Sequence, residues 1–527
     1  MIRRSTVLGP RRLRPASTLL AALVLVGAAR AQSGLVLRYQ LLELKGGETG
    51  STRAYAINNT GQVVGYIEVG GKKHSAHWHN RVTTDLHGTV HYDLQHPYPL
   101  FNQDYSEAFD ISDADQVIGT ARISIDCPPD ILITNAFIVR PAVLTDLATP
   151  YPGDALTNLR TFGNPCDTAY DSAATGVSNS NIVVGWADRS DGVTHAFLVR
   201  PIGGQFFTDQ NVDLVNDLMI DLGTLQASDP VSSATAVNDD GEVTGYSYTT
   251  VGGRAAYRAF LLTPLDNNND GVPDQWFVDG GDGANALMID LGTLGGSNSW
   301  GRAISNSGVI VGESDLDMPT GEHYTRAFRW ANGIMTDLGT LRDDPNHGFS
   351  SASGINDDGV IVGWAENEAR ERRAFIWQRG RMKDLNELLY LKTESGSTVT
   401  PSITLTEARD INDDGLIVGW GSVKGTQGAT TRGFLLIPTW LDPAELEEDE
   451  NSSPGGTDGT GGNYNGIPVF GPPTTPDSGE PNQPSTPTTP GSSFMGLCGS
   501  GTLTVLPLTI LGLCGLRSTR RHRTLRC

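Results

Sequence analysis

The chain has 527 residues and a formal net charge of −22. This acidic balance argues against nucleic acid or an anionic membrane surface as a partner, and it suits a solvated extracellular protein. Loss of the two arginine-rich ends described below would take the charge to about −33.

Residues 1–31 have the layout of a secretory signal. Arginines precede an apolar core from Leu19 to Val26, and Ala29-Arg30-Ala31 provides a cleavage site after Ala31. The apolar stretch is too short to span a bilayer, which argues against a membrane anchor at this end. The sequence therefore predicts that the protein is exported.

One phrase recurs seven times between residues 36 and 440. It consists of an apolar residue, a turn, a short Val/Ile-rich run that ends in glycine, a phrase such as Arg-Ala-Phe, and usually Asp-Leu. The glycines that end the runs lie 51 to 67 residues apart and are Gly65, Gly119, Gly185, Gly245, Gly312, Gly363 and Gly419. Such spacing is typical of propeller blades with insertions.

A single repeat contains the pattern of four short antiparallel strands. In the sixth, the turn in Ile355–Gly359 leads into Val360–Val362, a β-branched run too short for a helix. Ala374–Trp377 and Met382–Leu385 are further strands. Turn chemistry explains the recurring Asn-Asp-Asp-Gly without an ion site. The chain is therefore predicted to be all-β, a seven-bladed β-propeller over residues 36–440.

The seventh repeat lacks its last strand. Nothing resembling Asp-Leu follows Arg432–Leu436, whereas the mature N-terminus begins with an unpaired strand, Tyr39–Leu44. We expect this strand to pair with the seventh blade and close the ring. The Asp-Leu pairs of the first six repeats are Asp85-Leu86, Asp146-Leu147, Asp221-Leu222, Asp290-Leu291, Asp337-Leu338 and Asp384-Leu385.

Six of the ten histidines gather in the first repeat and the segment after it: His74, His77, His79, His87, His91 and His96. A pair two residues apart on a strand points to one side, as zinc or copper ligands can. His77, however, is placed where other repeats have Phe, and no cysteine or carboxylate lies beside it at ligand spacing. Packing is the favoured interpretation, and the role of the cluster stays open.

Two of the five cysteines, Cys127 and Cys166, lie in the repeat region. Cys127 falls between the second and third strands of blade two, and Cys166 in the connection that leaves that blade. Both connections emerge on the same face, and an exported protein favours oxidised cysteines. We expect a disulfide between them, with free thiols as the alternative.

A loop in the fourth repeat has the pattern of a calcium site. Oxygen donors alternate in it, and Gly271 stands where the chain must turn tightly. The expected ligands of a structural Ca²⁺ are Asp266, Asn268, Asp270, Val272 (through its backbone) and Asp274. The loop resembles those of thrombospondin type 3 and dockerin-like modules. It departs from the EF-hand because Phe277 replaces the bidentate Glu, and the alternative is a polar turn.

The C-terminal part changes character. Residues 443–493 are acidic and then rich in Pro, Thr and Gly, which predicts a disordered spacer. Residues 494–527 are apolar and end in arginines, a transmembrane-like pattern. With Cys498 before the apolar stretch, this tail resembles the PEP-CTERM and MYXO-CTERM sorting signals of bacteria. The resemblance implies cleavage by a membrane protease and a lipid on the cysteine, and a simple anchor is the alternative.

The repeats themselves resemble the extracellular HAF-repeat family of bacteria. The phrases that carry the resemblance are the Asn-x-x-Gly-x-Val-Val-Gly run, His195-Ala196-Phe197 and the segment from Asp290 to Gly296. The family implies a location in the cell envelope or at the cell surface, and it implies no known activity and no catalytic residues.

The sequence favours a binding, adhesion or structural surface module for an extracellular ligand, either a polysaccharide or a protein. Trp78, Trp364 and Trp420 are placed near the loops where such a ligand would be held. No nucleophile elbow, phosphate-binding loop or zinc-protease motif occurs, so catalysis is not expected. The alternative is a hydrolase or lyase that acts on polysaccharide at the mouth of the propeller channel.

Overall fold

The computed structural model describes residues 36–46, 50–86, 105–125, 131–139, 156–162, 170–211, 215–227, 231–281, 283–317, 323–344, 346–391, 399–424 and 430–441. All of them belong to the first of two compact units, residues 1–453 and 454–527. The predicted signal cleavage at Ala31, the Cys127–Cys166 disulfide, the spacer and the tail with Cys498 lie outside the described residues. Within the described ranges, no helix is long and apolar enough to cross a membrane.

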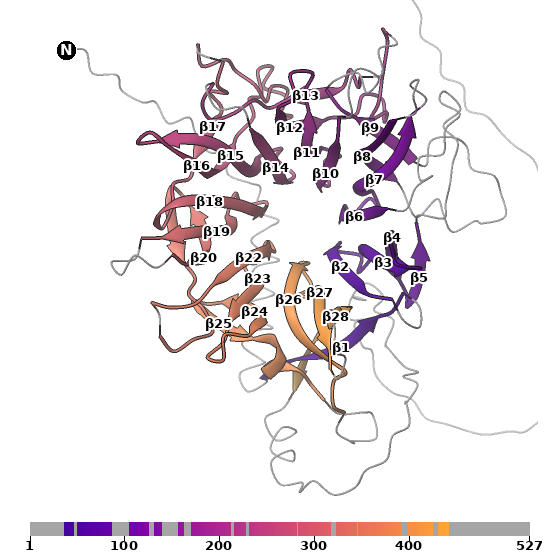
Figure 1. Cartoon of the computed structure of the whole chain (residues 1–527), viewed down its shortest axis with the longest axis vertical. Helices are drawn as coiled ribbons and strands as arrows, with labels where there is room; N and C mark the ends of the chain where they lie inside the picture. Colours follow the sequence, from indigo (N-terminus) through magenta and orange to yellow (C-terminus); the bar gives the residue numbers. More distant parts are fainter. Residues whose placement is uncertain are drawn as a thin grey trace, which may run out of the picture. The chain divides into compact units, whose positions relative to one another are not determined.

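Seven four-stranded antiparallel sheets are arranged around a common centre (Figure 1). Blade one contains β2 (Thr52–Ile57), β3 (Val63–Val69), β4 (Lys72–His79) and β5 (Val82–Asp85). Blade two contains β6 (Ser106–Ile111), β7 (Val117–Ile125), β8 (Ile131–Val139) and β9 (Leu156–Arg160). Blade three contains β10 (Ser172–Val177), β11 (Val183–Asp188), β12 (Thr194–Val199) and β13 (Met219–Asp221). Blade four contains β14 (Ser232–Val237), β15 (Val243–Val251), β16 (Arg254–Leu262) and β17 (Met288–Asp290).

The remaining blades complete the ring. Blade five contains β18 (Gly295–Ile304), β19 (Ile310–Leu316), β20 (Thr325–Ala331) and β21 (Ile334–Asp337). Blade six contains β22 (Ser350–Ile355), β23 (Ile361–Glu366), β24 (Arg372–Gln378) and β25 (Arg381–Asp384), followed by a 3-10 turn, η2 (Leu385–Leu388). Blade seven contains β26 (Ile403–Ile411), β27 (Ile417–Val423), β28 (Thr431–Leu441) and β1 (Val36–Leu44). The prediction of an all-β, seven-bladed arrangement is confirmed.

The outer strand of blade seven comes from the other end of the chain. β1 pairs antiparallel with β28 over nine residue pairs, from Val36 opposite Leu441 to Leu44 opposite Gly433. Tyr39 in β1 is only 2% exposed and belongs to the core cluster of blades six and seven. An N-terminal segment and a C-terminal segment therefore share one sheet.

The glycine that ends each Val/Ile-rich run has a steric reason. Every inner strand carries a β-bulge, and the glycine lies opposite the residue before it, as Gly363 lies opposite Ala352. A Cβ at Gly363 would lie 2.1 Å from the carbonyl oxygen of Ser351, and the other six glycines would meet the equivalent oxygen at 2.0 Å. No side chain fits there, so the repeat needs glycine at this position.

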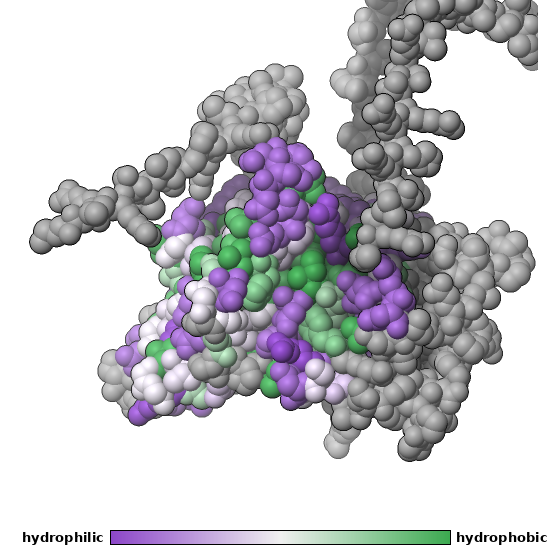
Figure 2. All heavy atoms as spheres, turned by 90° about the horizontal axis from the view of Figure 1, so that it is seen from above, coloured by the Kyte–Doolittle hydropathy of each residue, from purple (hydrophilic) through white to green (hydrophobic). Residues whose placement is uncertain are grey.

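The core lies between blades. One cluster joins Val184 and Leu198 of blade three to Ala234 and Phe260 of blade four, and similar clusters fill the other junctions. Because each sheet buries its faces against its neighbours, the blades stabilise one another around the ring. Viewed from its edge, the ring has hydrophilic and apolar residues interspersed over its surface (Figure 2).

Two details of the predicted repeats are wrong. In blade two the outer strand is β9, where Leu159 is fully buried, and it does not lie at Asp146-Leu147. In blade one Ala76 stands opposite Gly65 and so occupies the place of the repeated Phe, with His77 one position further on. Both misassignments arise where the local sequence departs from the repeat, so that only the strand pairing fixes the alignment.

Candidate functional site

Seven turn residues form a closed hydrogen-bonded ring at one end of the inner strands. They follow the inner strand of each blade and are Asn59, Asp113, Asn179, Asp239, Asn306, Asp357 and Asp413. The backbone N–H of each donates to the side-chain Oδ1 of the next residue around the ring, at 2.7–3.0 Å. The bond from Asp413 to Asn59 completes the ring. A cavity of about 150 Å³ is lined by these residues and their neighbours.

The asparagines of this ring separate all of its carboxylates except the neighbours Asp357 and Asp413. The amide of Asn59 donates to Oδ2 of Asp113 at 3.1 Å and to Oδ2 of Asp413 at 3.0 Å. The amide of Asn306 bridges its two aspartate neighbours in the same way. Because the amides of Asn59 and Asn306 each donate to a carboxylate on either side, repulsion between these carboxylates is reduced, whereas the amide of Asn179 donates to Asp239 at 3.5 Å. The ring therefore ties together the turns of all seven blades.

Two further carboxyl groups lie deeper between the blades. Asp110 accepts the N–H of Val177 at 2.9 Å, and Asp410 accepts the N–H of Ile57 at 2.9 Å, in each case from the next blade. Burial and the negative charge of Asp410 raise the pKa of Asp110 to about 7. Burial raises the pKa of Asp410 to about 6. Both residues are half-buried.

These polar turns are structural, as the sequence predicted for Asn-Asp-Asp-Gly. The sequence did not reveal that the turns bond to one another from blade to blade. Within the described ranges, no three His, Cys, Asp or Glu side chains come together as a metal site. The ring of turn residues is thus best understood as a tie between blades.

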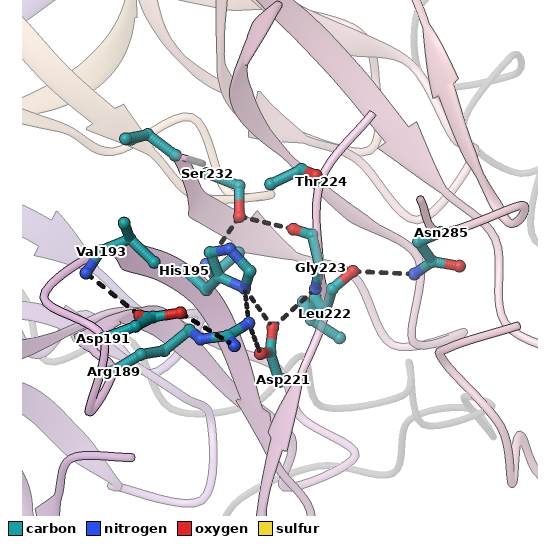
Figure 3. Close-up of polar contacts among 12 residues, drawn as sticks. Arg189, Asp191, Val193, His195, Asp221, Leu222, Gly223, Thr224, Ser232 and Asn285 are labelled. Carbon is teal, nitrogen blue, oxygen red and sulfur yellow. Dashed lines mark hydrogen bonds and ion pairs between the residues drawn. The ribbon is translucent and has the colours of Figure 1, made fainter. Parts of the chain in front are cut away.

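A Ser, His and Asp combination in blades three and four has the composition of a catalytic triad (Figure 3). Nδ1 of His195 lies 2.7 Å from Oδ1 of Asp221. The hydroxyl of Ser232, however, donates to the carbonyl of Gly223 at 2.6 Å and accepts the backbone N–H of Ala196 at 2.9 Å. A serine committed to two backbone groups is not held by the imidazole for attack. The combination is a junction between blades.

The environment of Asp221 supports this structural role. Burial raises the pKa of Asp221, but the hydrogen bond and charge of His195, the N–H of Gly223 and the charge of Arg189 together lower it below its ordinary value. In the repeat phrase, the His or Arg that precedes Ala-Phe therefore pairs with the Asp of the Asp-Leu strand, as His195 does with Asp221. The same serine bonds recur at three other junctions, through Ser172, Ser299 and Ser350.

A different cluster, at the other end of the inner strands, also joins neighbouring blades, and it differs in combining cations with aromatic rings. We call it the cation–aromatic cluster, and it consists of Arg53, Tyr55, Tyr66, Lys73, Tyr105, Glu107, Trp364, Arg372, Glu407, Arg409 and Trp420 from blades six, seven, one and two. Arg53 lies six residues before Asn59 on the same strand, about 20 Å along an extended chain. The cluster and the ring of turn residues are therefore separate.

The blade six and seven side of the cluster stacks arginines on tryptophans. The guanidinium of Arg372 lies 3.9 Å from the ring centre of Trp364. Those of Arg53 and Arg409 lie 4.6 and 5.9 Å from the ring centre of Trp420. Such stacking holds a guanidinium flat and leaves its N–H edge available.

A buried carboxylate lies among these arginines. Glu407 is 5% exposed and forms ion pairs with Arg372 and Arg409. Burial raises the pKa of Glu407, and the charges of Arg409, Arg372 and Arg53 offset part of that effect. Burial also lowers the pKa of Arg372. One carboxylate is thus shared by two or more cations in a poorly hydrated place.

The blade one and two side is built around Glu107. This carboxylate is 4% exposed, accepts the hydroxyl of Tyr55 at 2.8 Å and forms an ion pair with Lys73. Burial, followed by the charge of Glu107, raises the pKa of Tyr55 and of Tyr105. Tyr55 also packs against Trp420, with ring centres 5.8 Å apart, so it joins the two sides of the cluster.

Sequence reasoning found part of this cluster. Trp364 and Trp420, expected beside a ligand, lie in it, whereas Trp78 is 4% exposed and belongs to a core cluster of blades seven and one. Sequence reasoning missed the charged members. Arg53, Glu107 and Glu407 share one register position, where blades three, four and six have Ala173, Ser233 and Ser351. Blade five has Trp300 at this position, so charge at a position that is uncharged in the other four blades is the signal that would have found them.

The other predicted site residues lie elsewhere. His77 is buried, its Nε2 lies 2.7 Å from Gln62, and burial and then His79 lower its pKa to about 4. His74 pairs with Asp85 at 2.8 Å. His77 is thus engaged by an amide and His74 by a carboxylate, and His87, His91 and His96 lie outside the described residues.

The predicted calcium loop lies between β16 and β17. The carboxylate of Asp266 accepts the backbone N–H groups of Asp270 and Gly271 at 3.2 and 2.8 Å. That of Asp274 accepts the N–H of Asn267 at 3.2 Å. The carboxylates are turned toward the backbone of their own loop, so a cation would have to displace these bonds.

Comparisons with known proteins assign no activity to this chain. A family described as a protein of unknown function (DUF3466) matches residues 342–458, less than a quarter of the chain. No curated protein matches the sequence. Similar solved structures include the polysaccharide lyase Uly1 (9% identity, 71% of this chain, 88% of that chain, TM-score 0.35) and the lectin of Aleuria aurantia (13% identity, 67%, 97%, TM-score 0.27). At this level of similarity no ligand or activity carries over.

Proposed function

We propose that this protein is a binding module at the surface of a bacterial cell that holds an extracellular ligand, a polysaccharide or a protein, at the cation–aromatic cluster. The observation that carries the proposal is the convergence of Arg53, Arg372 and Arg409 with Trp364 and Trp420. Stacked cations and half-buried aromatic rings offer both charge and flat apolar area to a ligand.

The test is a glycan array probed with the full chain, in calcium and again in EDTA. We expect selective retention of one class of glycan and its loss in Trp364→Ala. Trp186 is a matched control, because it takes the same place in blade three and has no cation stacked on it. Equal binding by wild type, Trp364→Ala and Trp186→Ala would place the ligand elsewhere. If no glycan on the array binds, the expected ligand is a protein and not a polysaccharide.

A second candidate function is a lyase or hydrolase that acts on polysaccharide at the same cluster. It is favoured by Glu107, a buried carboxylate in contact with the phenol of Tyr55 and the amine of Lys73. These are groups that can exchange protons with a substrate. An argument against catalysis is that Glu107, Tyr55 and Lys73 are already paired with one another. Release of reducing ends or unsaturated sugars from the retained glycan, abolished by Glu107→Gln, would favour this function over simple binding.

We also propose that calcium binds the loop from Asp266 to Asp274 with a structural role, using Asn268, Asp270 and the Val272 carbonyl as further ligands. The support is the donor pattern of the sequence and the positive φ of Gly271, +88°, which gives the loop its tight turn. Calcium should raise the melting temperature, and Asp266→Asn should remove that rise. Equal melting in calcium and EDTA would contradict the site.

The pairing of β1 with β28 supports a further proposal, that the N-terminal strand is what closes the ring. An open blade would leave β28 as an unpaired edge. Deleting Val36–Leu44 should lower the melting temperature and promote self-association. Unchanged stability of the shortened chain would refute this role.

Export and attachment complete the proposal. They rest on the signal with cleavage after Ala31, the tail with Cys498, and the resemblance to HAF-repeat proteins and sorting signals. A mass measurement on the protein from its native cells should show loss of both ends, and non-reducing peptide mapping should show Cys127 linked to Cys166. An intact N-terminus in the cell would contradict export.

A further inference from the structure

Within the cation–aromatic cluster, positive charge exceeds negative charge. The cluster holds four cations, Arg53, Lys73, Arg372 and Arg409, and two carboxylates, Glu107 and Glu407. From outside it, Glu313, which is paired with Arg302, acts on Arg372, and Asp410 acts on Arg409. The chain as a whole has a net charge of −22, so a local excess of cations is the opposite of its general balance. Such a patch attracts an anion and repels other parts of the same acidic surface.

Arg53 is the arginine of the cluster that forms no ion pair among the residues that the structure describes. It stacks on Trp420, but it makes no hydrogen bond to another residue within the described part of the chain, and its Nε is buried without a partner. Nε of Arg409 is also buried without a partner. Buried donors of this kind are unfavourable until an acceptor reaches them. The acceptor that fits a guanidinium edge is a carboxylate or another planar or tetrahedral oxyanion.

The arrangement extends beyond one anion. Arg372 belongs to blade six, Arg409 to blade seven and Arg53 to blade one, so the cations follow the ring over three consecutive blades. The rings of Trp364, Tyr55 and Tyr105 between and beside them are half-buried and present apolar area. A ligand with repeated charges and flat, partly apolar units matches this alternation better than a small ion does.

We infer that the cation–aromatic cluster binds an acidic polysaccharide through its carboxylate groups, with Arg53 and Arg372 as the residues that recognise the charge. The inference rests on the proposed binding function and names its ligand class. A uronate chain brings one carboxylate per sugar to the guanidinium edges, and the sugar rings lie against the aromatic side chains. Sulfate esters share the oxyanion chemistry, and an acidic protein is a separate class of ligand.

The experiment measures binding of the full chain to polygalacturonate, dextran sulfate and neutral dextran by calorimetry at two salt concentrations. We expect polygalacturonate to bind, more weakly at high salt, and neutral dextran not to bind. Arg53→Gln and Arg372→Gln should each weaken the affinity about tenfold or more. Arg254→Gln, at an exposed hairpin end, is the control and should change it by less than about twofold.

The outcomes separate the inference from the proposed function. Binding of dextran sulfate alone would overturn the carboxylate assignment, and binding of neutral dextran that Trp364→Ala abolishes would overturn the anionic class while keeping the site. Polygalacturonate binding that survives both arginine variants would overturn the site itself. Melting curves check that each variant is folded, and Arg372, whose side chain is 46% exposed, provides the variant least able to disturb folding.

Discussion

Asp110→Asn should change how the free energy of unfolding depends on pH. In the folded protein the pKa of Asp110 is raised to about 7, from an ordinary value of 3.8, by burial and by the charge of Asp410. Between these two values the folded state holds a proton that the unfolded state has lost. Stability should therefore rise as the pH falls from about 7 toward about 4, and fall as the pH rises.

The magnitude follows from the shift and from the environment of the carboxyl group. A shift of about 3 units corresponds to about 4 kcal/mol at most, at about 1.4 kcal/mol per unit. Asp110 is half-buried, and we expect from it a pH-dependent contribution of about 1–3 kcal/mol. Asparagine keeps one acceptor for the N–H groups of Val177 and Ile111, which both bond the carboxylate, and should lose about 1 kcal/mol of hydrogen bonding at all pH values.

The assay is urea unfolding of wild type and Asp110→Asn at about pH 5 and about pH 8. The wild type should be more stable at the lower pH, and the variant should lose most of that difference while Asp410 keeps the remainder. Asp191→Asn, on an exposed loop, is the control for a simple loss of negative charge. A variant with the same pH dependence as the wild type would refute the reasoning.

Three other changes test the packing within a blade and the ties between blades. Gly363→Ala places a Cβ 2.1 Å from the Ser351 carbonyl and should cost about 2–4 kcal/mol, measured by denaturant unfolding. Ser232→Ala removes two hydrogen bonds across the junction of blades three and four and should lower the free energy of unfolding by about 1–3 kcal/mol in the same assay. Unchanged stability would show that these hydrogen bonds do not stabilise the junction. Asn59→Asp replaces an amide between two carboxylates with a third carboxylate. The melting temperature should fall and should recover at low pH, and a fall that does not depend on pH would point to packing instead.

Most of the fold could be predicted from the repeats, because the sequence of each blade contains the pattern of its own strands and turns. A β-branched run that ends in glycine is local information, and the clash at Gly363 shows why the pattern cannot be relaxed. Where a repeat departs from the pattern, prediction fails. Blade two has no Asp-Leu at its outer strand, and its place is taken by Leu159 in β9, which only pairing with β8 identifies.

The candidate site was less accessible to prediction, because its residues come from four blades. Arg53 and Arg409 meet at Trp420 although they stand over 350 residues apart, and no local pattern joins them. The sequence located the tryptophan through its place after the repeated glycine. It did not indicate which cation would stack on it.

The sequence by itself determined the number of blades, the order of their strands and the position of their turns, since these depend on short-range sterics and periodicity. Only the tertiary structure decided what the turns and inner strands do together. Closing the ring aligns Asn59 with Asp413 and sets Arg53 beside Trp420, and both contacts exist because blade seven and blade one become neighbours. Contacts across that junction depend on ring closure, a property of the whole chain that no single repeat contains.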